Sequence, residues 1–501
     1  MELRRRGTWA LGVALAAFCW APPVAADDSR YQNIIVGARA TGTGGAFAAI
    51  SDDASGLVYN PAGIVDVKRA NLSVSTSLYG FERHSGGGIF TGLPLTGLPK
   101  LSSTDINIIP SSAGTVMGLG ELLPDGAHRH AIGFGLMVPS LTSVSEQEDT
   151  TSNWRTSTGI RRSRRINDRT LYAGVGYAYR LSEVARLGLA LHYVLRSVDA
   201  VDEYLFVSPA ERAGEARVVS GQSDLKLQSG SLVAVGGVKL VPYRKLSLGL
   251  SFTTQSVQLH HNGSFTLRES RPGQDPGTTE YSALAVEINE GPRANLGPLG
   301  SRSPFSVRAG LAWVERADWT FMADVIGYLP VYYELIPRTA ADGTPIEESR
   351  VPLATRVERG PVVNGATGFE KLLGRDLSLS VGAFTNLPSS PMLKVEPGTN
   401  TLVQGTSRLS RIPMVGTTFA LGYFSEHSLS RLGFMTAFGV GDRVGVKDRD
   451  ALATGNGRVQ FERFAASEWT FYVFISSTFR YGEGRSERTL FGLPSFRGGK
   501  S

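Results

Sequence analysis

The 501-residue sequence predicts an all-β protein: a transmembrane antiparallel β-barrel of about 14 strands with an N-terminal hatch in its lumen. Three observations indicate this fold class. Short stretches in which every second residue is apolar recur along the chain, as in lipid-facing barrel strands. Aromatic residues stand at the ends of several apolar faces, and long connections alternate with short ones. A soluble sandwich shares the first feature, but it has no reason to alternate its connection lengths.

Residues 1–26 have the pattern of a secretory signal peptide. Arg4 to Arg6 form a positive start, Trp9 to Trp20 is an apolar stretch, and Val24-Ala25-Ala26 offers small residues for cleavage before Asp27. The single cysteine, Cys19, lies in this segment. We therefore expect an exported mature chain that forms no disulfide.

Composition and charge exclude several classes of protein. Hydrophobic residues make up 42% of the chain, which is too apolar for a disordered protein, and glycine makes up about 12%. Beyond the N-terminus we find no run of 18 apolar residues, so membrane-spanning helices are not expected. Removing Arg4 to Arg6 and Glu2 from 51 basic and 45 acidic residues leaves a net charge of +4. Such a mild excess argues against a nucleic-acid partner.

Period-two stretches define the expected strands. In residues 187–195, for example, four leucines and Tyr193 alternate with smaller or polar residues. The fourteen strands are expected at about 72–84, 104–118, 129–146, 169–181, 186–206, 231–241, 245–268, 304–316, 318–334, 361–371, 376–387, 413–425, 430–442 and 468–481. Expected aromatic ends of the apolar faces are Trp313, Trp319, Phe321, Trp469 and Tyr481.

Connection lengths indicate the orientation of the barrel. Short connections are expected at 181–186, 241–245, 315–318, 371–376 and 425–430. Long connections are expected at 147–168, 207–230, 269–304, 335–360, 388–412 and 442–468. Outer-membrane barrels have tight periplasmic turns and long extracellular loops, so an even strand number places both termini in the periplasm.

Residues 27–70 do not have the pattern of a strand. The segment 37–63 is dense in glycine and alanine, with Asp52-Asp53 and Asn60-Pro61 as turn-forming pairs. Small residues allow backbones to pack closely, as a plug in a crowded lumen requires. A nucleotide-binding loop is not indicated, because position 47 is Phe where a third glycine would be needed.

The N-terminal segment resembles the FadL/TodX-type outer-membrane transporters of long-chain fatty acids and other hydrophobic compounds. The resemblance rests on four motifs that follow the signal peptide in this order: Gly37-Ala38-Arg39-Ala40, Gly44-Gly45-Ala46-Phe47, Asp52-Asp53-Ala54-Ser55 and Asn60-Pro61-Ala62-Gly63. It implies a hatch over 27–70 and a barrel over 71–482. The tail 483–501 departs from the family, whose barrels usually end on an aromatic strand terminus.

The resemblance also implies a route for the ligand. Capture would take place between two extracellular loops, 207–230 and 269–304, with a second site near the hatch and exit sideways through the third strand. Pro139 lies inside that strand, followed by Ser140, and Pro110 in the second strand borders the same place. A proline lacks the ladder N–H, so either the wall is locally unpaired here or the strand ends earlier.

Three arginines are candidates for binding a ligand carboxylate: Arg196, Arg308 and Arg180. A lumen guanidinium can hold a carboxylate through charge-assisted hydrogen bonds. The alternative is a salt bridge to a hatch carboxylate, for which Asp52 or Asp53 are the candidates. The cluster Arg161-Arg162-Ser163-Arg164-Arg165 with Arg169 is expected on an extracellular loop, where it meets lipopolysaccharide phosphates or is solvated.

No catalytic or metal-binding motif is apparent, so we expect no enzyme, no cofactor and no metal. His260 and His261 are adjacent and would point to opposite faces of a strand. The favoured function is hydrophobic-compound transport by a monomer in the outer membrane, inserted by the barrel assembly machinery. Two alternatives stay open: a binding or scaffold partner of a secretion or assembly system on the same barrel, and an outer-membrane hydrolase.

Overall fold

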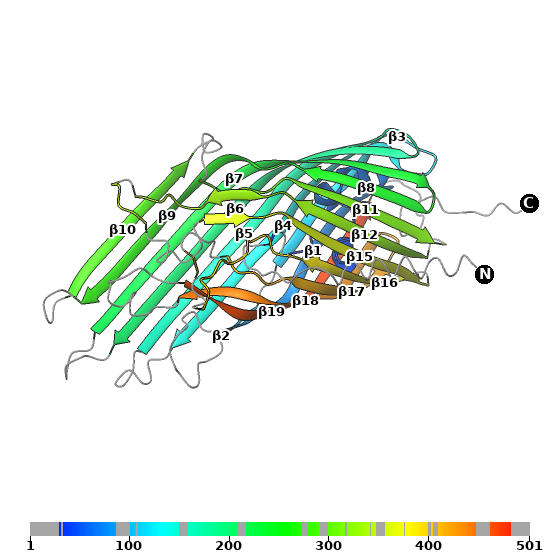
Figure 1. Ribbon diagram of the computed structural model, residues 1–501. Helices are drawn as coiled ribbons and strands as arrows, with labels where there is room; N and C mark the ends of the chain where they lie inside the picture. The colour runs from blue at the N-terminus through cyan, green and yellow to red at the C-terminus, as the bar shows by residue number, and fades with distance from the viewer. Residues whose placement is uncertain are drawn as a thin grey trace, which may run out of the picture.

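The computed structural model shows a closed antiparallel β-barrel, in which the two termini of the sheet, Ala70 and Tyr481, lie at one end (Figure 1). Residue Ala70 of the first strand lies opposite Tyr481 of the last, and this pairing closes the wall. The structure describes residues 30–31, 34–86, 101–106, 109–149, 159–208, 217–272, 279–290, 299–315, 318–340, 342–346, 356–374, 376–398, 402–403, 409–446 and 461–481. The expected signal peptide 1–26 and tail 483–501 lie outside these ranges.

The elements, in chain order, are α2 (Ala38–Gly42), α3 (Gly56–Tyr59), η1 (Pro61–Asp66), β1 (Ala70–Gly86), β2 (Leu101–Ile106), β3 (Ile109–Leu122), β4 (His128–Asp149), β5 (Gly159–Arg180), β6 (Ala185–Ser208), β7 (Arg217–Tyr243), β8 (Leu246–Thr253), β9 (Val257–Pro272), β10 (Thr279–Glu290), β11 (Ser306–Glu315), β12 (Trp319–Tyr328), β13 (Val331–Glu334), β14 (Arg356–Arg359), β15 (Val362–Leu373), β16 (Leu377–Asn386), β17 (Met414–Phe424), β18 (Ser428–Val446) and β19 (Phe461–Tyr481).

The barrel wall has fourteen positions, as the sequence predicts. Seventeen strands form the sheet, but β2 with β3, β8 with β9, and β10 with β11 each share one position in the wall. The two short strands β13 and β14 pair separately. Successive members of the wall are antiparallel throughout, so neighbouring positions are joined by hairpin connections.

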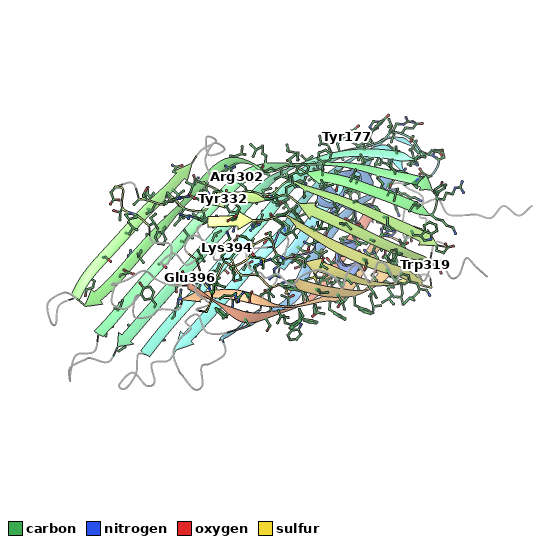
Figure 2. The ribbon with its side chains drawn as sticks, in the orientation of Figure 1. Tyr177, Arg302, Trp319, Tyr332, Lys394 and Glu396 are labelled. Atoms are coloured by element: carbon green, nitrogen blue, oxygen red, sulfur yellow. The ribbon has the colours of Figure 1, made fainter. Side chains whose placement is uncertain are left out.

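In the half of the wall nearer the termini, apolar side chains face outward. On β6, Leu189 is 60% exposed, whereas its neighbour Ala190 is 1% exposed. Trp469 and Tyr481 are both exposed and lie twelve residues apart on one outward row of β19, a spacing of about 30 Å in height for a tilted strand. Figure 2 shows Tyr177 and Trp319 near the same end of the barrel. These features define a lipid-facing belt with aromatic edges.

Beyond the belt the polarity of the wall is reversed. Further along β6, Val198 and Ala200 point inward and are buried, while Ser197 and Asp199 are exposed. The inward apolar side chains of β5, β6, β7, β9 and β10 form a second core, into which β13 also packs. Figure 1 shows these long strands extending far past the others, opposite the termini. This part of the wall therefore stands in water above the membrane.

Two of the expected long loops are mostly strand. Residues 159–168 of the expected connection 147–168 belong to β5, and residues 217–230 of the expected connection 207–230 belong to β7. The expected connection 269–304 contains β10, which pairs with β9. The expected strand 318–334 divides into β12 and β13, which belong to different sheets. The polar outward faces of the extended strands concealed their period from sequence analysis.

The segment before β1 lies inside the barrel. Helix α2 contacts β16 to β19 and β1, whereas η1 contacts β4 to β7 on the other side of the lumen. Val36, Phe47, Leu57 and Ile64 of this segment are almost fully buried in a core shared with the wall. Among the described residues, no helix is long and apolar enough to cross a membrane.

Candidate functional site

Asn60 joins the N-terminal segment to the wall. Its side-chain amide donates to Ala48 O at 2.9 Å and to Val238 O of β7 at 3.0 Å. Its Oδ1 accepts from Ala62 N at 3.1 Å, and Pro61 is the first residue of η1. The asparagine thus ends α3, begins η1 and anchors both to the barrel, while Pro61 supplies a preset φ at the helix start.

Close backbone approach explains the small residues of the motif. Gly44 has φ of +67°, and a Cβ there would lie 2.8 Å from Ala383 N of β16. On the opposite wall, a Cβ on Gly188 of β6 would lie 2.3 Å from Ala62 N. Gly45 and Gly63 lie in the same packed segment. The rings of Phe47 and Tyr59 pack edge to face, with 5.6 Å between their centroids. The motif residues therefore fill the lumen against the wall.

The paired aspartates have partners within the segment. Arg39 binds Asp52 at 2.6 Å and Glu370 of β15 at 3.0 Å. Asp53 accepts from Ser55 N at 2.8 Å. Burial and the charge of Asp52 raise the pKa of Asp53, against the effect of its hydrogen bonds to Ser55. Arg196 instead binds Asp168 of β5, so the expected bridge from Arg196 to Asp52 or Asp53 was wrong.

A carboxylate of the wall holds the turn around Phe47. Asp324 of β12 accepts from Phe47 N at 3.0 Å and from Ala48 N at 2.9 Å. Arg308 of β11 lies 3.4 Å from the same carboxylate and 4.7 Å over the ring of Tyr59. Arg308 therefore faces the lumen, as expected, and its charge is shared with a wall aspartate.

An ion-pair cluster fixes the end of η1. Asp66 pairs with Arg186 at 3.0 Å and with Lys239 at 2.8 Å, and Lys239 also donates to Ile50 O at 2.7 Å. Burial would raise the pKa of Asp66, but the two cations together lower it to about 2. The cluster ties the end of the segment to β6 and β7.

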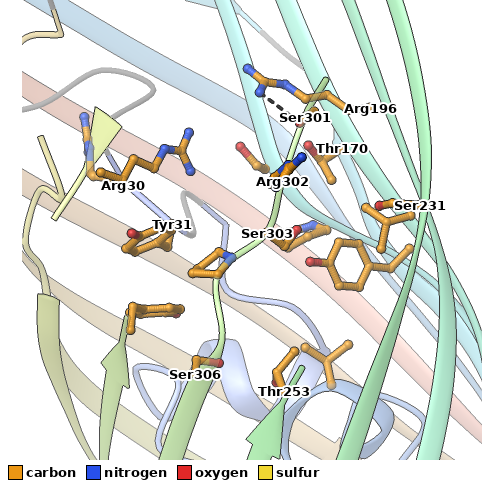
Figure 3. Close-up of a pocket in the computed structure, with 18 of the residues that line it drawn as sticks. Arg30, Tyr31, Thr170, Arg196, Ser231, Thr253, Ser301, Arg302, Ser303 and Ser306 are labelled. Carbon is orange, nitrogen blue, oxygen red and sulfur yellow. Dashed lines mark hydrogen bonds between the residues drawn. The ribbon is translucent and has the colours of Figure 1, made fainter. Parts of the chain in front are cut away.

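A cavity of about 130 Å³ lies above the segment, inside the barrel (Figure 3). Its lining combines residues of the N-terminal segment with residues of the wall. Asp168 is the one carboxylate among the described lining residues. The polar part of the lining consists largely of guanidinium groups and tyrosines, which are Arg30, Arg196, Arg302, Arg308, Arg359, Tyr31, Tyr172, Tyr328 and Tyr333. A smaller cavity of about 60 Å³ shares Arg308 and Tyr328 with it. Five guanidinium groups and one carboxylate thus line the site, and Arg30 and Arg308 also pair with Glu468 and Asp324.

Arg196 is held in place by the wall strand β5, by β13 and by Ser301. Its Nε donates to Asp168 Oδ1 of β5 at 3.0 Å, its Nη2 donates to the second oxygen of that carboxylate, and its Nη1 donates to Tyr333 OH at 2.8 Å and to Ser301 Oγ at 3.2 Å. Figure 3 shows the bond to Ser301. The guanidinium is thus oriented toward the cavity by four hydrogen bonds.

The wall changes its pairing beside Pro139. The β3–β4 register ends at Ser112 opposite Met137, and the β4–β5 register shifts between Met137 and Ser140. The β4–β5 pairing resumes at Ser140, which lies opposite Thr170. The β1–β3 register also shifts beside Pro110. Pro139 supplies no ladder N–H, and both Pro139 and Ser140 line the cavity.

Arg180 lies elsewhere. It pairs with Asp125 at 2.6 Å, at the end of the barrel where the short turns lie. It does not line either cavity, so its expected role in binding a ligand carboxylate is not supported by its position. Among the described residues, no group of three or more His, Cys, Asp or Glu side chains could hold a metal ion.

Sequence analysis missed several residues of the site. Arg30 and Tyr31 precede the recognised motifs, yet both line the cavity, and Arg30 binds Glu468 of β19 at 2.6 Å. Burial raises the pKa of Tyr31 to about 12, against the charge of Arg359. Asp324 alternates with apolar residues inside a strand. An aspartate at such a position is a signal that could have indicated a buried partner.

The closed wall, its apolar belt and the N-terminal segment packed inside it define the class of protein: a transmembrane β-barrel of the outer-membrane type. No family model matches the sequence, and no curated protein matches it. Its fold is that of the FadL/TodX-type channels, as solved structures show.

Three solved structures illustrate this likeness. The chain is similar to a Pseudomonas aeruginosa FadL homologue, at 10% identity over 90% of this chain and 100% of that chain, with a TM-score of 0.59. It is similar to the P. putida toluene transporter TodX, at 14% identity over 90% and 99%, with a TM-score of 0.56. It is similar to the Ralstonia pickettii toluene transporter TbuX, at 12% identity over 91% and 100%, with a TM-score of 0.51.

Proposed function

We propose that this protein carries long-chain fatty acids or other hydrophobic compounds across the outer membrane. The N-terminal segment acts as a hatch, and the ligand leaves sideways through the wall beside Pro139. One observation supports this proposal most: the arginine-lined cavity reaches Pro139 and Ser140, where the pairing of the wall changes. The solved neighbours named as toluene transporters are consistent with a hydrophobic cargo.

Arg196 and Arg308 would bind the acidic head of the ligand. Both are less than 10% exposed and both line the cavity. Each is already neutralised by one wall carboxylate, Asp168 or Asp324, so a ligand carboxylate would add to an existing network. A charge-assisted hydrogen bond in such a site contributes about 1.5–3 kcal/mol.

Sideways exit suits an apolar tail. Each CH₂ kept out of water gains about 0.8 kcal/mol, and this gain is lost when a ligand enters the periplasm. Release into the bilayer preserves it. Beside Pro139 the ladder between strands is interrupted, so fewer hydrogen bonds must break there to open the wall than at a fully paired position.

Binding of oleate and of oleyl alcohol to the purified barrel tests the role of Arg196. We would replace the pair together, as Arg196→Gln with Asp168→Asn, so that no charge is left buried alone. We expect oleate affinity to fall about tenfold or more, and oleyl alcohol affinity to stay within about twofold.

The matched control is Arg162→Gln with Asp202→Asn, an ion pair between the same two strands that does not line the cavity. It should leave both affinities unchanged. An equal loss of affinity for oleate and oleyl alcohol, or no loss of affinity for oleate, would show that Arg196 does not bind the carboxylate of the ligand.

The remaining partners follow from the fold. We propose that the chain works as a monomer, that the barrel assembly machinery inserts it, and that lipopolysaccharide surrounds its outer half. Transport needs neither a cofactor nor a catalytic residue, because binding and release alone move the ligand. A single species at the monomer mass in native mass spectrometry would support the monomeric state.

A further inference from the structure

Three arginines of β5 form a row on the outside of the wall. Arg161, Arg165 and Arg169 are exposed, whereas the alternate residues Ile166 and Asp168 are buried. Residues four apart share one face of a strand, so successive guanidinium groups start about 13 Å apart. We call these three residues the β5 arginine row.

The row begins where the lipid-facing belt ends. Toward the termini the same outward face carries Val175 and Tyr177, each more than 40% exposed. Arg169 is separated from this apolar stretch only by the half-buried Leu171 and Ala173. Because the long strands extend away from the termini, the row lies on the extracellular side of the belt (Figure 1). The row therefore stands at the level of the outer-leaflet head groups.

The two flanks of the row differ. On the β4 side, Ser143, Ser145 and Gln147 lie opposite Asn167, Arg165 and Ser163, which places hydroxyl and amide groups beside the arginines. The β6 side carries the exposed acids Asp199 and Glu203. Of these, Asp199 lies opposite Lys226 of β7. On β4 the flank is neutral beside Arg165 and Arg169, whereas Asp149 lies opposite Arg161. The field over β4 is therefore set by Arg165 and Arg169.

We propose that the β5 arginine row binds lipopolysaccharide, with Arg169 at a lipid A phosphate and Arg165 and Arg161 at anionic groups of the inner-core sugars. Guanidinium groups match phosphate geometry in a bidentate manner. The serine hydroxyls of β4 add hydrogen-bonding groups for the sugars. A lipid whose acyl chains cover Val175 presents its phosphates at the height of Arg169. Among the head groups of the outer leaflet, these phosphates have the highest density of negative charge.

This proposal does not depend on what the barrel transports. Because the row lies outside the wall, its loss leaves the cavity residues in place. The proposal does add that bound lipopolysaccharide covers the outer face of β4, the strand that contains Pro139.

Titration of the barrel in phospholipid nanodiscs with lipid A tests the phosphate contact, and titration with lipopolysaccharide that also carries the inner-core sugars tests the contacts of Arg165 and Arg161. The variant is Arg161→Gln with Arg165→Gln and Arg169→Gln. The matched control removes three basic side chains at the short-turn end instead, as Arg129→Gln, Arg244→Gln and Lys371→Gln. Heat-modified gel mobility checks that each barrel is folded. Native mass spectrometry counts bound lipid A and gives its apparent affinity.

We expect the row variant to lose lipid A affinity at least tenfold and the control to keep it within twofold. Dephosphorylated lipid A should bind the wild type and the row variant equally weakly. Free inorganic phosphate should not displace lipid A at millimolar concentration, because it lacks the acyl chains that the belt covers. An unchanged affinity in the folded row variant, or equal binding of dephosphorylated lipid A to the wild type, would overturn the proposal.

Discussion

The backbone N–H of Ile34 donates a 3.1 Å hydrogen bond to the carbonyl oxygen of Pro139. This bond joins the start of the N-terminal segment to the residue at which the wall changes its pairing. Ile34 also packs in a small apolar cluster with Val138, Met435 and Tyr472. The segment and the wall defect are therefore in direct contact, so a displacement of Ile34 by a ligand would act on the wall at the proposed exit.

Replacing Asn60 should loosen the hatch. In Asn60→Ala, the carbonyls of Ala48 and Val238 lose their donor and Ala62 N loses its acceptor. A buried group left without a partner costs about 1–3 kcal/mol. We expect hydrogen exchange over residues 45–65 to speed up at least tenfold, while the yield of folded barrel changes little.

Two further variants make this prediction specific. Asn60→Asp keeps the acceptor for Ala62 N but has no donors, so it should resemble Asn60→Ala. Asn262→Ala, at an exposed position of β9, should leave exchange unchanged. Wild-type exchange in Asn60→Ala would show that Asn60 is only a turn residue.

Removing the hatch should open the lumen to ions. The segment fills the space between opposite walls, with Arg39 bound to β15 and Asp66 bound to β6 and β7. Deletion of residues 28–66 should therefore raise single-channel conductance in planar bilayers severalfold. A folded deletion variant with the conductance of the wild type would contradict the assignment of this segment as a plug.

The attachment of η1 should weaken in acid. The pKa of Asp66 is lowered to about 2 in the folded state, so its stabilising contribution is complete above about pH 4 and is lost as pH falls toward 2. The loss amounts to about 2 kcal/mol, or roughly 30-fold in the opening equilibrium. We expect channel openings to become more frequent over this range.

Asp66→Asn serves as the comparison for that experiment. The variant should open frequently at pH 5 already and should change less than the wild type between pH 4 and 2. Identical pH profiles would assign the acid response to other carboxylates.

The wall could be predicted from sequence mainly where it meets lipid. There apolar side chains such as Leu189 face outward and alternate with buried small residues such as Ala190, so the period is plain. Above the membrane, Arg161 and Arg165 face water while Ile166 faces inward. This reversal breaks the pattern at the belt edge, which is why the extended parts of β5 and β7 were expected to be loops.

The candidate site was predictable in its residue types but not in its partners. The sequence predicted that Arg196 faces the lumen and that Pro139 interrupts the wall, and the structure brings both to one cavity. Which carboxylate pairs with Arg196 depends on the β5–β6 register, in which Thr170 lies opposite Arg196 and Asp168 lies two residues away. Local motifs carry no information on that register.

The proposed exit can be tested by joining the wall across the place where pairing ends. The mature chain expected from the sequence has no cysteine, so Ser111→Cys on β3 and Ser140→Cys on β4 can be linked with a short thiol-to-thiol crosslinker. The matched control links Ser140→Cys to Thr170→Cys, which lie opposite each other in the paired β4–β5 ladder.

The decisive measurement is uptake of a long-chain fatty acid by vesicles that contain each crosslinked barrel, with the crosslink confirmed by mass spectrometry. If the ligand leaves beside Pro139, the β3–β4 crosslink should abolish most uptake, and the β4–β5 crosslink should leave it near the uncrosslinked rate. Equal uptake through the β3–β4 crosslinked barrel and its uncrosslinked form would contradict lateral exit at this point.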